Sequence, residues 1–487
     1  MRIIGIRHRI KKTAEGEARP TQVVILENGE TRSLQLETET DELDFVLDRF
    51  PVNFRKVEEG DELSTFCTHH VQWRKLKKEE NYEELPASLI RKDGKTYELA
   101  TYVPAAYDGL KPGDNISMIL GGSGDNLAFA LARRGQEIDA KVFRIPPFVL
   151  KGKRVEKKED GDAELLANLF SSEKSLFYEV GPRDLDLIWL RECLRNRVDA
   201  MKARMACGQR LRTHLIGTIF CSPEGKFPEG DLEKASDEAK ANDKIFAALS
   251  SEEAKRERDL EKACDALNVY RVIFEPIEGC GPKIASRIIG AVIDIRRFET
   301  KAKLRAFCGV HVLEDGRFPR RRNNEVANWN GDCRQALFLL GDQFNRRPNS
   351  EWGQRLLAAK AKYRLAHPEP IVSDDKLTFL YRRLEVFFRR HGVTIQPDEF
   401  KIVSIDGLYA WFRACVTEME EETRDNLSRE IIEWEEKIEK AQVSERTVKI
   451  FTAGHLHKMA IWYTIGKFVE NLFNTWWKLE AETETTK

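Results

Sequence analysis

The stretch from residue 116 to residue 145 restricts the fold most strongly, because it reads as strand, tight turn, helix and strand in succession. Residues 116–120 form an apolar run, and the turn Gly121-Gly122-Ser123-Gly124-Asp125 follows. Apolar side chains then recur at helical spacing, and residues 140–145 regain β character. A βαβ unit of this kind places two parallel strands beneath one helix. We therefore expect an α/β sheet within residues 1–175.

The glycine turn in this unit admits two interpretations. A turn between a strand and a helix can cradle a phosphate, but this one lacks the spacing G-x-G-x-x-G of dinucleotide-binding proteins. It also lacks the Gly-Lys-Ser/Thr ending of a P-loop. We favour a tight strand-to-helix connection.

The N-terminal residues predict three more strands. Residues 2–6 are a short β-rich run, and Asn28-Gly29 separates the apolar residues 22–26 from residues 34–36. An Asn-Gly pair between two such runs is a strong hairpin signal, because both residues tolerate positive φ. The sheet is therefore expected to begin with a hairpin.

The next segment predicts a helix followed by an insertion. Apolar residues at helical spacing indicate a helix over residues 41–50, with Thr40 or Asp41 as its cap and Pro51 as its end. Residues 51–112 are charged and rich in turn formers, so we interpret them as an irregular insertion in the sheet domain.

The rest of the chain reads as helical. We predict a helical, coiled-coil arm over residues 176–268, because apolar residues at helical spacing alternate there with many charges. An all-α module over residues 269–370 and a helical extension over residues 371–487 follow. Arms of this kind commonly carry self-association, so we expect a homodimer or a higher oligomer.

The composition limits where a polyanion can bind. The 487 residues have a formal net charge of −1, which argues against uniform coating of a nucleic acid. The nine cysteines include no CxxC pair, which indicates reduced thiols and not a disulfide framework or zinc ribbon. No apolar run reaches the length of a signal sequence or membrane span, so we expect a cytoplasmic protein without a membrane partner.

Positive charge is concentrated in one stretch of the chain. Residues 296–347 contain 12 Lys and Arg against 6 Asp and Glu. Just before them, Gly279-Cys280-Gly281-Pro282 predicts a tight turn and a helix start, whose free backbone N–H groups suit a phosphate.

An arginine-rich loop follows this helix. Residues 317–324 combine four arginines with a phenylalanine and two asparagines, a set that fits RNA or DNA better than a plain solvated loop. The candidate nucleic-acid-binding residues of the whole stretch are Gly279, Gly281, Lys283, Arg287, Arg296, Arg297, Lys301, Lys303, Arg317, Arg320, Arg321, Arg322, Asn323, Asn324 and Arg334.

The order of these motifs resembles a known family, the bridge-RNA-guided insertion-sequence transposases of the DEDD type, which include pilin invertases. The resemblance is carried by Gly279-Cys280-Gly281-Pro282 through Gly309, followed by Asn330-Gly331-Asp332-Cys333-Arg334-Gln335-Ala336-Leu337. This module is also similar to the Nop domain of guide-RNA proteins and to the Tas proteins. The resemblance implies an RNase H-like (RuvC-like) N-terminal domain and a Nop-like, helix-hairpin-helix C-terminal domain.

The resemblance also implies carboxylates that bind two Mg²⁺ ions. At the four family positions this chain has Arg7, Gly121 with Asp125 four residues later, Glu159, and Asp162. The candidate catalytic residues are therefore Asp125, Glu159 and Asp162, with Glu159 and Asp162 as metal ligands. A cation at position 7 would repel Mg²⁺, so a complete two-metal site is not expected.

The family's serine nucleophile has no counterpart in the matching interval, where the chain has Glu314-Asp315-Gly316. A carboxylate cannot perform phosphoseryl exchange, so the resemblance favours a protein that binds nucleic acid over one that exchanges strands.

Three functions remain open from the sequence. The first is a guide-RNA-binding, DNA-targeting protein in which base pairing reads the sequence. The second is a Mg²⁺-dependent RuvC-like nuclease or DEDD transposase, with Asp160 as a further possible ligand. The third is a non-catalytic helical assembly protein. Guide RNA and target DNA are the expected partners, and Mg²⁺ is the expected cofactor only if the RuvC-like site is active.

Overall fold

The computed structural model describes most of the chain. The described residues exclude 1, 11–17, 59, 78–79, 81–84, 95, 155–158, 224–231, 314–317, 320–326, 367–371, 374–420, 444–447, 450–452 and 486–487. The chain divides into two compact units, Met1–Leu337 with Val469–Lys487, and Phe338–Phe468.

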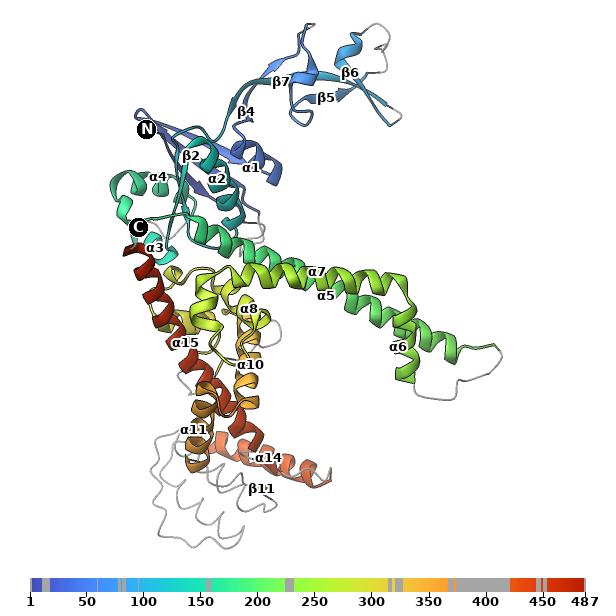
Figure 1. Cartoon of the computed structure of the whole chain (residues 1–487), viewed down its shortest axis with the longest axis vertical. Coiled ribbons are helices and arrows are strands. Elements are labelled where there is room, and N and C mark those ends of the chain that lie inside the picture. The colour runs from blue at the N-terminus through green and yellow to red at the C-terminus, as the bar shows by residue number, and fades with distance from the viewer. Residues whose placement is uncertain are drawn as a thin grey trace. The chain divides into compact units, whose positions relative to one another are not determined.

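A six-stranded mixed sheet forms the centre of the N-terminal region (Figure 1), with the strand order β10-β9-β8-β1-β2-β3. Strands β1, β8 and β9 are parallel neighbours, and β1-β2-β3 is an antiparallel meander. The strands are β1 Ile3–Arg7, β2 Thr21–Glu27, β3 Glu30–Leu36, β8 Asn115–Ile119, β9 Lys141–Ile145 and β10 Tyr178–Glu179. The predicted βαβ unit is confirmed, and the predicted hairpin turns at Asn28 and Gly29, both with positive φ.

Helices cover both faces of this sheet. The helices are α1 Glu39–Val46, α2 Asp125–Ile138, α3 Pro147–Lys153 and α4 Asp162–Ser172. Ile4 and Ile6 of β1 pack with α1 and α2 on one face, whereas Ile3 packs with α4 on the other. At Gly5 a Cβ would lie 1.9 Å from the carbonyl oxygen of Ala163, so α4 rests directly on the strand backbone. The ends of β1 and α4 are thereby held close together.

The predicted boundaries of the first helix were wrong. Helix α1 begins after Thr38, whose hydroxyl accepts from the N–H of Asp41 while the Asp41 carboxylate accepts from the N–H of Thr38. This capping box starts the helix earlier than a cap at Thr40 or Asp41. Pro51 does not end it, because residues 50 and 51 already belong to the next strand, β4.

The interpretation of residues 51–112 as an irregular insertion was also wrong. They form a second sheet of four strands, with β7 pairing β4, β5 and β6. The strands are β4 Phe50–Lys56, β5 Gln72–Lys75, β6 Ile90–Asp93 and β7 Thr96–Asp108. The buried core of this sheet is small, centred on Val71, Ala100 and Val103. With so few buried residues, the strands lack the strict apolar alternation that identifies a strand in a sequence.

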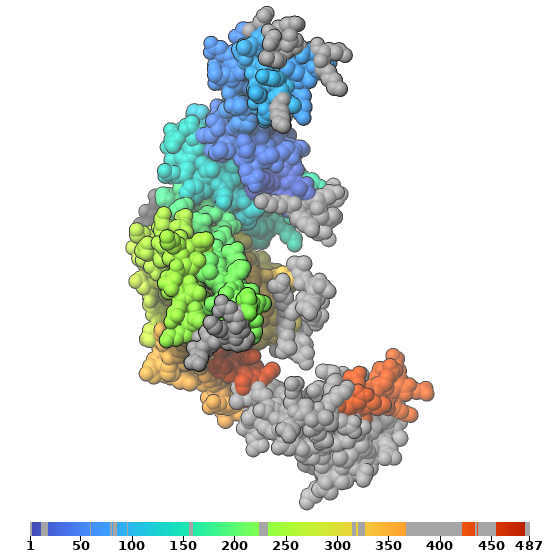
Figure 2. Space-filling view, turned by 90° about the vertical axis from the view of Figure 1, so that its right-hand side faces the viewer, coloured from blue at the N-terminus to red at the C-terminus, as the bar shows by residue number. Residues whose placement is uncertain are grey.

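Within residues 176–268, where the arm was predicted, β10 is a strand of the main sheet and the described residues from Pro182 onward are mostly helical. The arm consists of α5 Pro182–Phe220, α6 Leu232–Asn242 and α7 Lys244–Asp265. Helices α5 and α7 lie side by side (Figure 1), with Arg204 paired to Glu253 and Phe246 packed against Gly208. In Figure 2 the side chains of the two helices, in green and yellow-green, lie against each other. A close approach at Gly208 lets this pair pack tightly.

The remaining described elements are mostly helices. They are α8 Pro282–Val292, α9 Lys301–Phe307, α10 Gly331–Arg346, α11 Glu351–Ala366, α14 Glu421–Val443 and α15 Ala453–Thr485, with the short strands β11 Val372–Ser373 and β12 Val448–Lys449. In the second unit, Phe344, Trp352 and Phe468 form an aromatic core between α10, α11 and α15. None of the helices in the described part of the chain has the length and apolarity that a membrane crossing requires. A mixed α/β region followed by a largely helical part agrees with the predicted fold class at this level.

Candidate functional site

The ends of β1 and β8 meet at one edge of the main sheet, near the candidate carboxylates that the resemblance implied. Because β1 and β8 are parallel neighbours, Arg7 and the glycine turn after Ile119 leave the sheet at the same edge. Arg7 is buried, and its Nη2 donates to the carbonyl oxygen of Pro20 at 3.2 Å. Burial, followed by the charge of Arg19, lowers the pKa of Arg7, while nearby carboxylates act in the opposite direction. A cation therefore lies at the position that the resemblance matched to the first family carboxylate.

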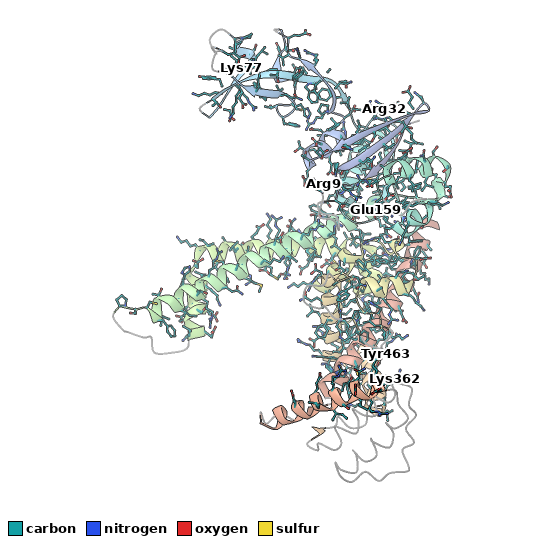
Figure 3. All side chains as sticks on the ribbon, turned by 180° about the vertical axis from the view of Figure 1, so that it is seen from behind. Arg9, Arg32, Lys77, Glu159, Lys362 and Tyr463 are labelled. Atoms are coloured by element: carbon teal, nitrogen blue, oxygen red, sulfur yellow. The ribbon has the colours of Figure 1, made fainter. Side chains whose placement is uncertain are left out.

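The carboxylate of Asp162 is held by a second arginine. Asp162 is the first residue of α4, and the Nε of Arg154 donates to its Oδ1 at 2.7 Å while Nη2 donates to Oδ2. This is a two-point guanidinium–carboxylate pair, which uses both oxygens. Glu159, labelled in Figure 3, has a side chain 49% exposed and lies 3.8 Å from the same guanidinium. Asp160 pairs with Arg19 at 2.9 Å.

Asp125 is enclosed by two further arginines. Its side chain is 1% exposed, with Oδ1 accepting from Arg144 at 3.0 Å and Oδ2 accepting from Arg191 at 2.7 Å. Arg144 extends from β9 and Arg191 from α5, so the carboxylate fastens the sheet to the arm. Both of its oxygens have charged partners, and the side chain has no open face.

These carboxylates, as placed, do not fit a pair of Mg²⁺ ions. Two-metal catalysis needs carboxylate oxygens that converge on the ions, whereas the oxygens of Asp125 and Asp162 face guanidinium groups. Within the described parts of the chain, Asp125, Glu159 and Asp162 do not form a convergent ligand group. No reaction step can be derived through Mg²⁺ at these residues in this arrangement.

The same edge holds a chain of polar side chains that sequence reasoning missed. Ser123 Oγ lies 2.9 Å from His8 Nδ1, and His8 Nε2 lies 3.2 Å from Glu42 Oε1. Thr21 also donates to Glu42, at 2.6 Å. Burial opposes ionisation of Glu42, but hydrogen bonds from His8 and Thr21 outweigh it and lower the pKa of this carboxyl. With Nε2 protonated, His8 donates to Glu42, and the single hydrogen of the Ser123 hydroxyl can go to His8 Nδ1 or to the carbonyl oxygen of Arg9, 3.2 Å away.

No local signal in the sequence pointed to this hydroxyl–imidazole–carboxylate chain. His8 follows β1, Glu42 lies in α1, and Ser123 lies in the glycine turn. The pairing of β1 with β8 brings the glycine turn to His8, and the packing of α1 on the sheet adds Glu42. Of these three segments, the sequence analysis singled out only the glycine turn, and it did so as a strand-to-helix connection.

The predicted helix start after Gly279 is confirmed. Gly279 has φ +87°, Gly281 is the N-cap, and Pro282 is the first residue of α8. The N–H groups of Ile284 and Ala285 donate to the carbonyl oxygen of Gly281. Gly281 and Lys283 are exposed, so the positive end of the helix dipole faces solvent.

Two of the predicted nucleic-acid-binding arginines are used inside the protein. Arg296 is 6% exposed and pairs with Asp294 at 2.7 Å and with Asp184 at 3.2 Å. Arg297 donates to the carbonyl oxygens of Ala291 and Val292. Its Nε would lie 2.5 Å from a Cβ at Gly121, which has φ +83°. The glycine turn of the sheet thus packs directly on Arg297.

Arg296 belongs to a buried cluster that we call the ion-pair hub, formed by Arg183, Asp184, Asp294, Arg296 and Glu480. Arg183 pairs with Asp294 at 2.8 Å and also with Glu480, which accepts from the indole of Trp476 at 2.8 Å. Burial opposes ionisation of Asp294, but the charges of Arg183 and Arg296 outweigh it and lower the pKa of this carboxyl. The hub joins α5, the segment after α8, and α15.

Other predicted nucleic-acid-binding residues lie at the surface. Lys301 and Lys303 are exposed in the first turn of α9, and Lys283 pairs with Glu257 of α7. Arg287 donates to Gln335 at 2.8 Å, and the guanidinium of Arg334 lies 5.1 Å from the Trp329 ring centroid. The described residues do not include Arg317, Arg320, Arg321, Arg322, Asn323, Asn324 or the Glu314-Asp315-Gly316 interval.

A model of a known protein family matches this segment of the chain. Residues 272–316 match the model of the transposase IS116/IS110/IS902 family. The match begins before α8 and includes its glycine turn, α8 and α9. No curated protein matches the chain. On the evidence of this segment, the chain is related to the IS116/IS110/IS902 transposases at the level of lineage.

Proposed function

We propose that this protein is a transposase-like, DNA-binding protein. The observation that carries the proposal is the family match over residues 272–316, because transposases act on DNA. The matched segment also contains the exposed helix start at Gly281 and the exposed lysines of α9. Backbone N–H groups and ammonium groups are suitable contacts for phosphate oxygens. DNA binding is therefore the function that the match and the surface support together.

The binding surface that we propose is made of Lys283, Arg287, Lys301, Lys303 and Arg334. The guanidinium of Arg334, 5.1 Å from the Trp329 ring centroid, is a further proposed phosphate contact. Arg296 and Arg297 are excluded from this surface because their charges are used internally. The arginine-rich loop at residues 317–324 remains a proposed part of it.

The finer proposal is that an RNA guides the protein to DNA. The chain has a net charge of −1, and its proposed nucleic-acid surface is confined to one segment. A protein of this kind suits binding to the phosphate backbone of a guide RNA or its duplex with DNA, without reading the base sequence. Base pairing would then supply sequence specificity. As part of this proposal, residues 269–370 form a Nop-like domain that binds the RNA, and residues 1–175 form an RNase H-like domain.

A metal-dependent transposase or nuclease is the second candidate, and the family match favours it. For Mg²⁺ to bind, Arg154 would have to leave Asp162 and Arg191 would have to leave Asp125. Asp125 is almost fully buried, so its release requires movement of α5 relative to the sheet. Asp162 shares its partner Arg154 with the exposed Glu159. A rearranged metal site is therefore easier to form at Asp162 and Glu159 than at the buried Asp125.

Binding is tested by comparing Lys301→Ala/Lys303→Ala with the control Lys202→Ala, since Lys202 is 70% exposed on α5, outside the proposed surface. Affinity for duplex DNA and for RNA is measured from low to high salt. The double variant should bind more weakly and lower the salt slope by about 1 per lost phosphate contact. Unchanged slopes in the double variant would contradict the proposed surface. Binding that does not weaken with salt would favour a helical assembly protein.

Guidance and cleavage are tested on the same preparation. Sequencing of co-purified nucleic acid should yield a discrete small RNA, and its absence would contradict guidance. Cleavage of DNA is then assayed with and without Mg²⁺, in the wild-type protein and in Asp162→Ala. Mg²⁺-dependent cleavage that disappears in Asp162→Ala would establish the enzymatic candidate.

A further inference from the structure

Three side chains with metal-binding atoms converge at the base of the second sheet. They are Asp44 in α1 and the adjacent His69 and His70, which precede β5. Both histidine Nε2 atoms lie 2.7 Å from the same oxygen, Oδ2 of Asp44. One carboxylate oxygen and two imidazole nitrogens thus meet within 4.8 Å of one another.

The carboxylate is fixed from behind. Arg49 Nε donates to Asp44 Oδ1 at 2.9 Å, and the backbone N–H of Arg49 donates to the carbonyl oxygen of Asp44. With Oδ1 engaged, Oδ2 points at the two histidines. A partner on the far oxygen commonly orients a carboxylate that binds a metal. Asp44 is 1% exposed, so little solvent competes for it.

The histidines are also held in place. The N–H of His70 donates to the carbonyl oxygen of Cys67 at 2.9 Å, which closes a turn. His70 is 5% exposed and its ring lies 5.9 Å from that of Tyr107 on β7. His69 is 45% exposed, so its side of the cluster opens to solvent. A metal ion that enters there can keep a bound water on the open side.

The ligand atoms converge on one point. Because Arg49 takes Oδ1 of Asp44, both imidazole Nε2 atoms meet at the one remaining oxygen, Oδ2. Nδ1 of His70 is buried and has no hydrogen-bond partner among the described residues. The two rings are also close, with centroids 4.1 Å apart.

We propose that Asp44, His69 and His70 bind a zinc-type divalent cation. Two imidazole nitrogens and one carboxylate oxygen form a donor set that suits Zn²⁺, with a water in the fourth position. Ligand atoms about 2.0–2.2 Å from a tetrahedral zinc lie roughly 3.3 Å apart, so each N–O separation must widen by about 0.6 Å. The exposed His69 can make such a movement without disturbing the core.

The cation would join the second sheet to the main one. Phe45 and Val46, next to Asp44, are buried in the core of the main sheet. Val71, next to His70, is buried in the core of the second sheet. Metal bound between these neighbours would connect the two cores directly. This inference concerns stability and does not depend on the proposed function.

The test is zinc content and stability of the full-length protein. After exposure to Zn²⁺ and removal of unbound metal, we expect about one zinc per chain in the wild type by elemental analysis. Asp44→Asn and His69→Ala should lose it, whereas the control His214→Ala, which removes an exposed histidine on α5, should keep it. Arg49→Ala keeps all three ligands and should weaken zinc binding about 10–100-fold, because the carboxylate loses its orientation.

A second readout separates metal binding from folding defects. Co²⁺ in place of zinc should give visible d–d absorption in the wild type and in His214→Ala, and not in His69→Ala with an unchanged circular dichroism spectrum. Chelator should lower the melting temperature of the wild type and leave Asp44→Asn unaffected. Equal zinc content in wild type and His69→Ala, or no zinc in either, would overturn the proposal.

Discussion

Asp294→Asn is the substitution with the clearest expected effect on stability. Asp294 is 0% exposed and accepts from two guanidinium groups, those of Arg183 and Arg296, at 2.8 and 2.7 Å. The asparagine side chain has almost the same shape but carries no charge. The variant therefore leaves the buried Arg296 and the 27% exposed Arg183 with less compensation, and Asp184 and Glu480 remain as the anions of the hub.

Removing one partner from a buried ion pair costs about 3–5 kcal/mol. For a domain of 150–250 residues, 1 kcal/mol corresponds to roughly 2–4 °C, which gives a loss of about 6–20 °C. The unit that contains the hub is larger than this, so the lower end of that range is the better expectation.

The assay is thermal unfolding, with Glu137→Gln as the matched control. Glu137 pairs with Arg134 at 2.5 Å on α2, but its side chain is 65% exposed. Pairs at the surface contribute about 0.2–1 kcal/mol, so the control should lose little. Equal losses in both variants would refute the reasoning, because they would show that the hub contributes no more than a surface pair.

The hub also predicts a pH dependence with a defined sign. Asp294 has a lowered pKa in the folded protein, so its stabilising effect is complete above the unfolded-state pKa of about 3.9. That contribution is lost as the pH falls from this value towards the lower folded-state pKa. The difference in melting temperature between wild type and Asp294→Asn should therefore shrink below about pH 4 and stay constant near neutrality.

Further predictions concern the glycine turn and the thiols. Gly121→Ala should lower the melting temperature more than Gly122→Ala. Both glycines have positive φ, which costs about 1–3 kcal/mol for a residue with a side chain. Only a Cβ at Gly121 would also displace Arg297. Equal losses would show that this contact is unimportant. Iodoacetamide should modify the exposed Cys221 of the native protein and spare Cys280, since burial raises the pKa of the Cys280 thiol to about 12. Mass spectrometry of the labelled peptides measures both sites, and rapid labelling of Cys280 would contradict its burial.

Local signals in the sequence predicted the elements that local chemistry determines. The hairpin follows from Asn28-Gly29, whose backbone angles only a few residues adopt easily. The start of α8 follows from a glycine turn and Pro282 at the first helical position. The βαβ unit follows from two apolar runs on either side of one amphipathic helix. Each of these signals lies within about thirty residues of sequence.

The candidate sites could not be predicted in the same way, because they depend on contacts between distant segments. The sequence made Asp125 a candidate metal ligand, because it does not show that Arg144 of β9 and Arg191 of α5 pair with this carboxylate. Arg296 looked like a surface cation, yet its partner Asp294 is only two residues away in the sequence. Burial of that pair depends on α5 and α15, which no local pattern reveals.

The order in which the chain emerges from the ribosome gives the hub another consequence. Arg183 is separated from Asp294 by 111 residues and from Glu480 by 297 residues. At about 5–20 residues per second, the 297 residues from Arg183 to Glu480 take roughly 15–60 s to synthesise. During most of that time, the N-terminal sheet and the arm can fold while Arg183 still lacks Glu480. The last anion of the hub arrives only once α15 has been synthesised, so the hub is completed after the sheet and the arm.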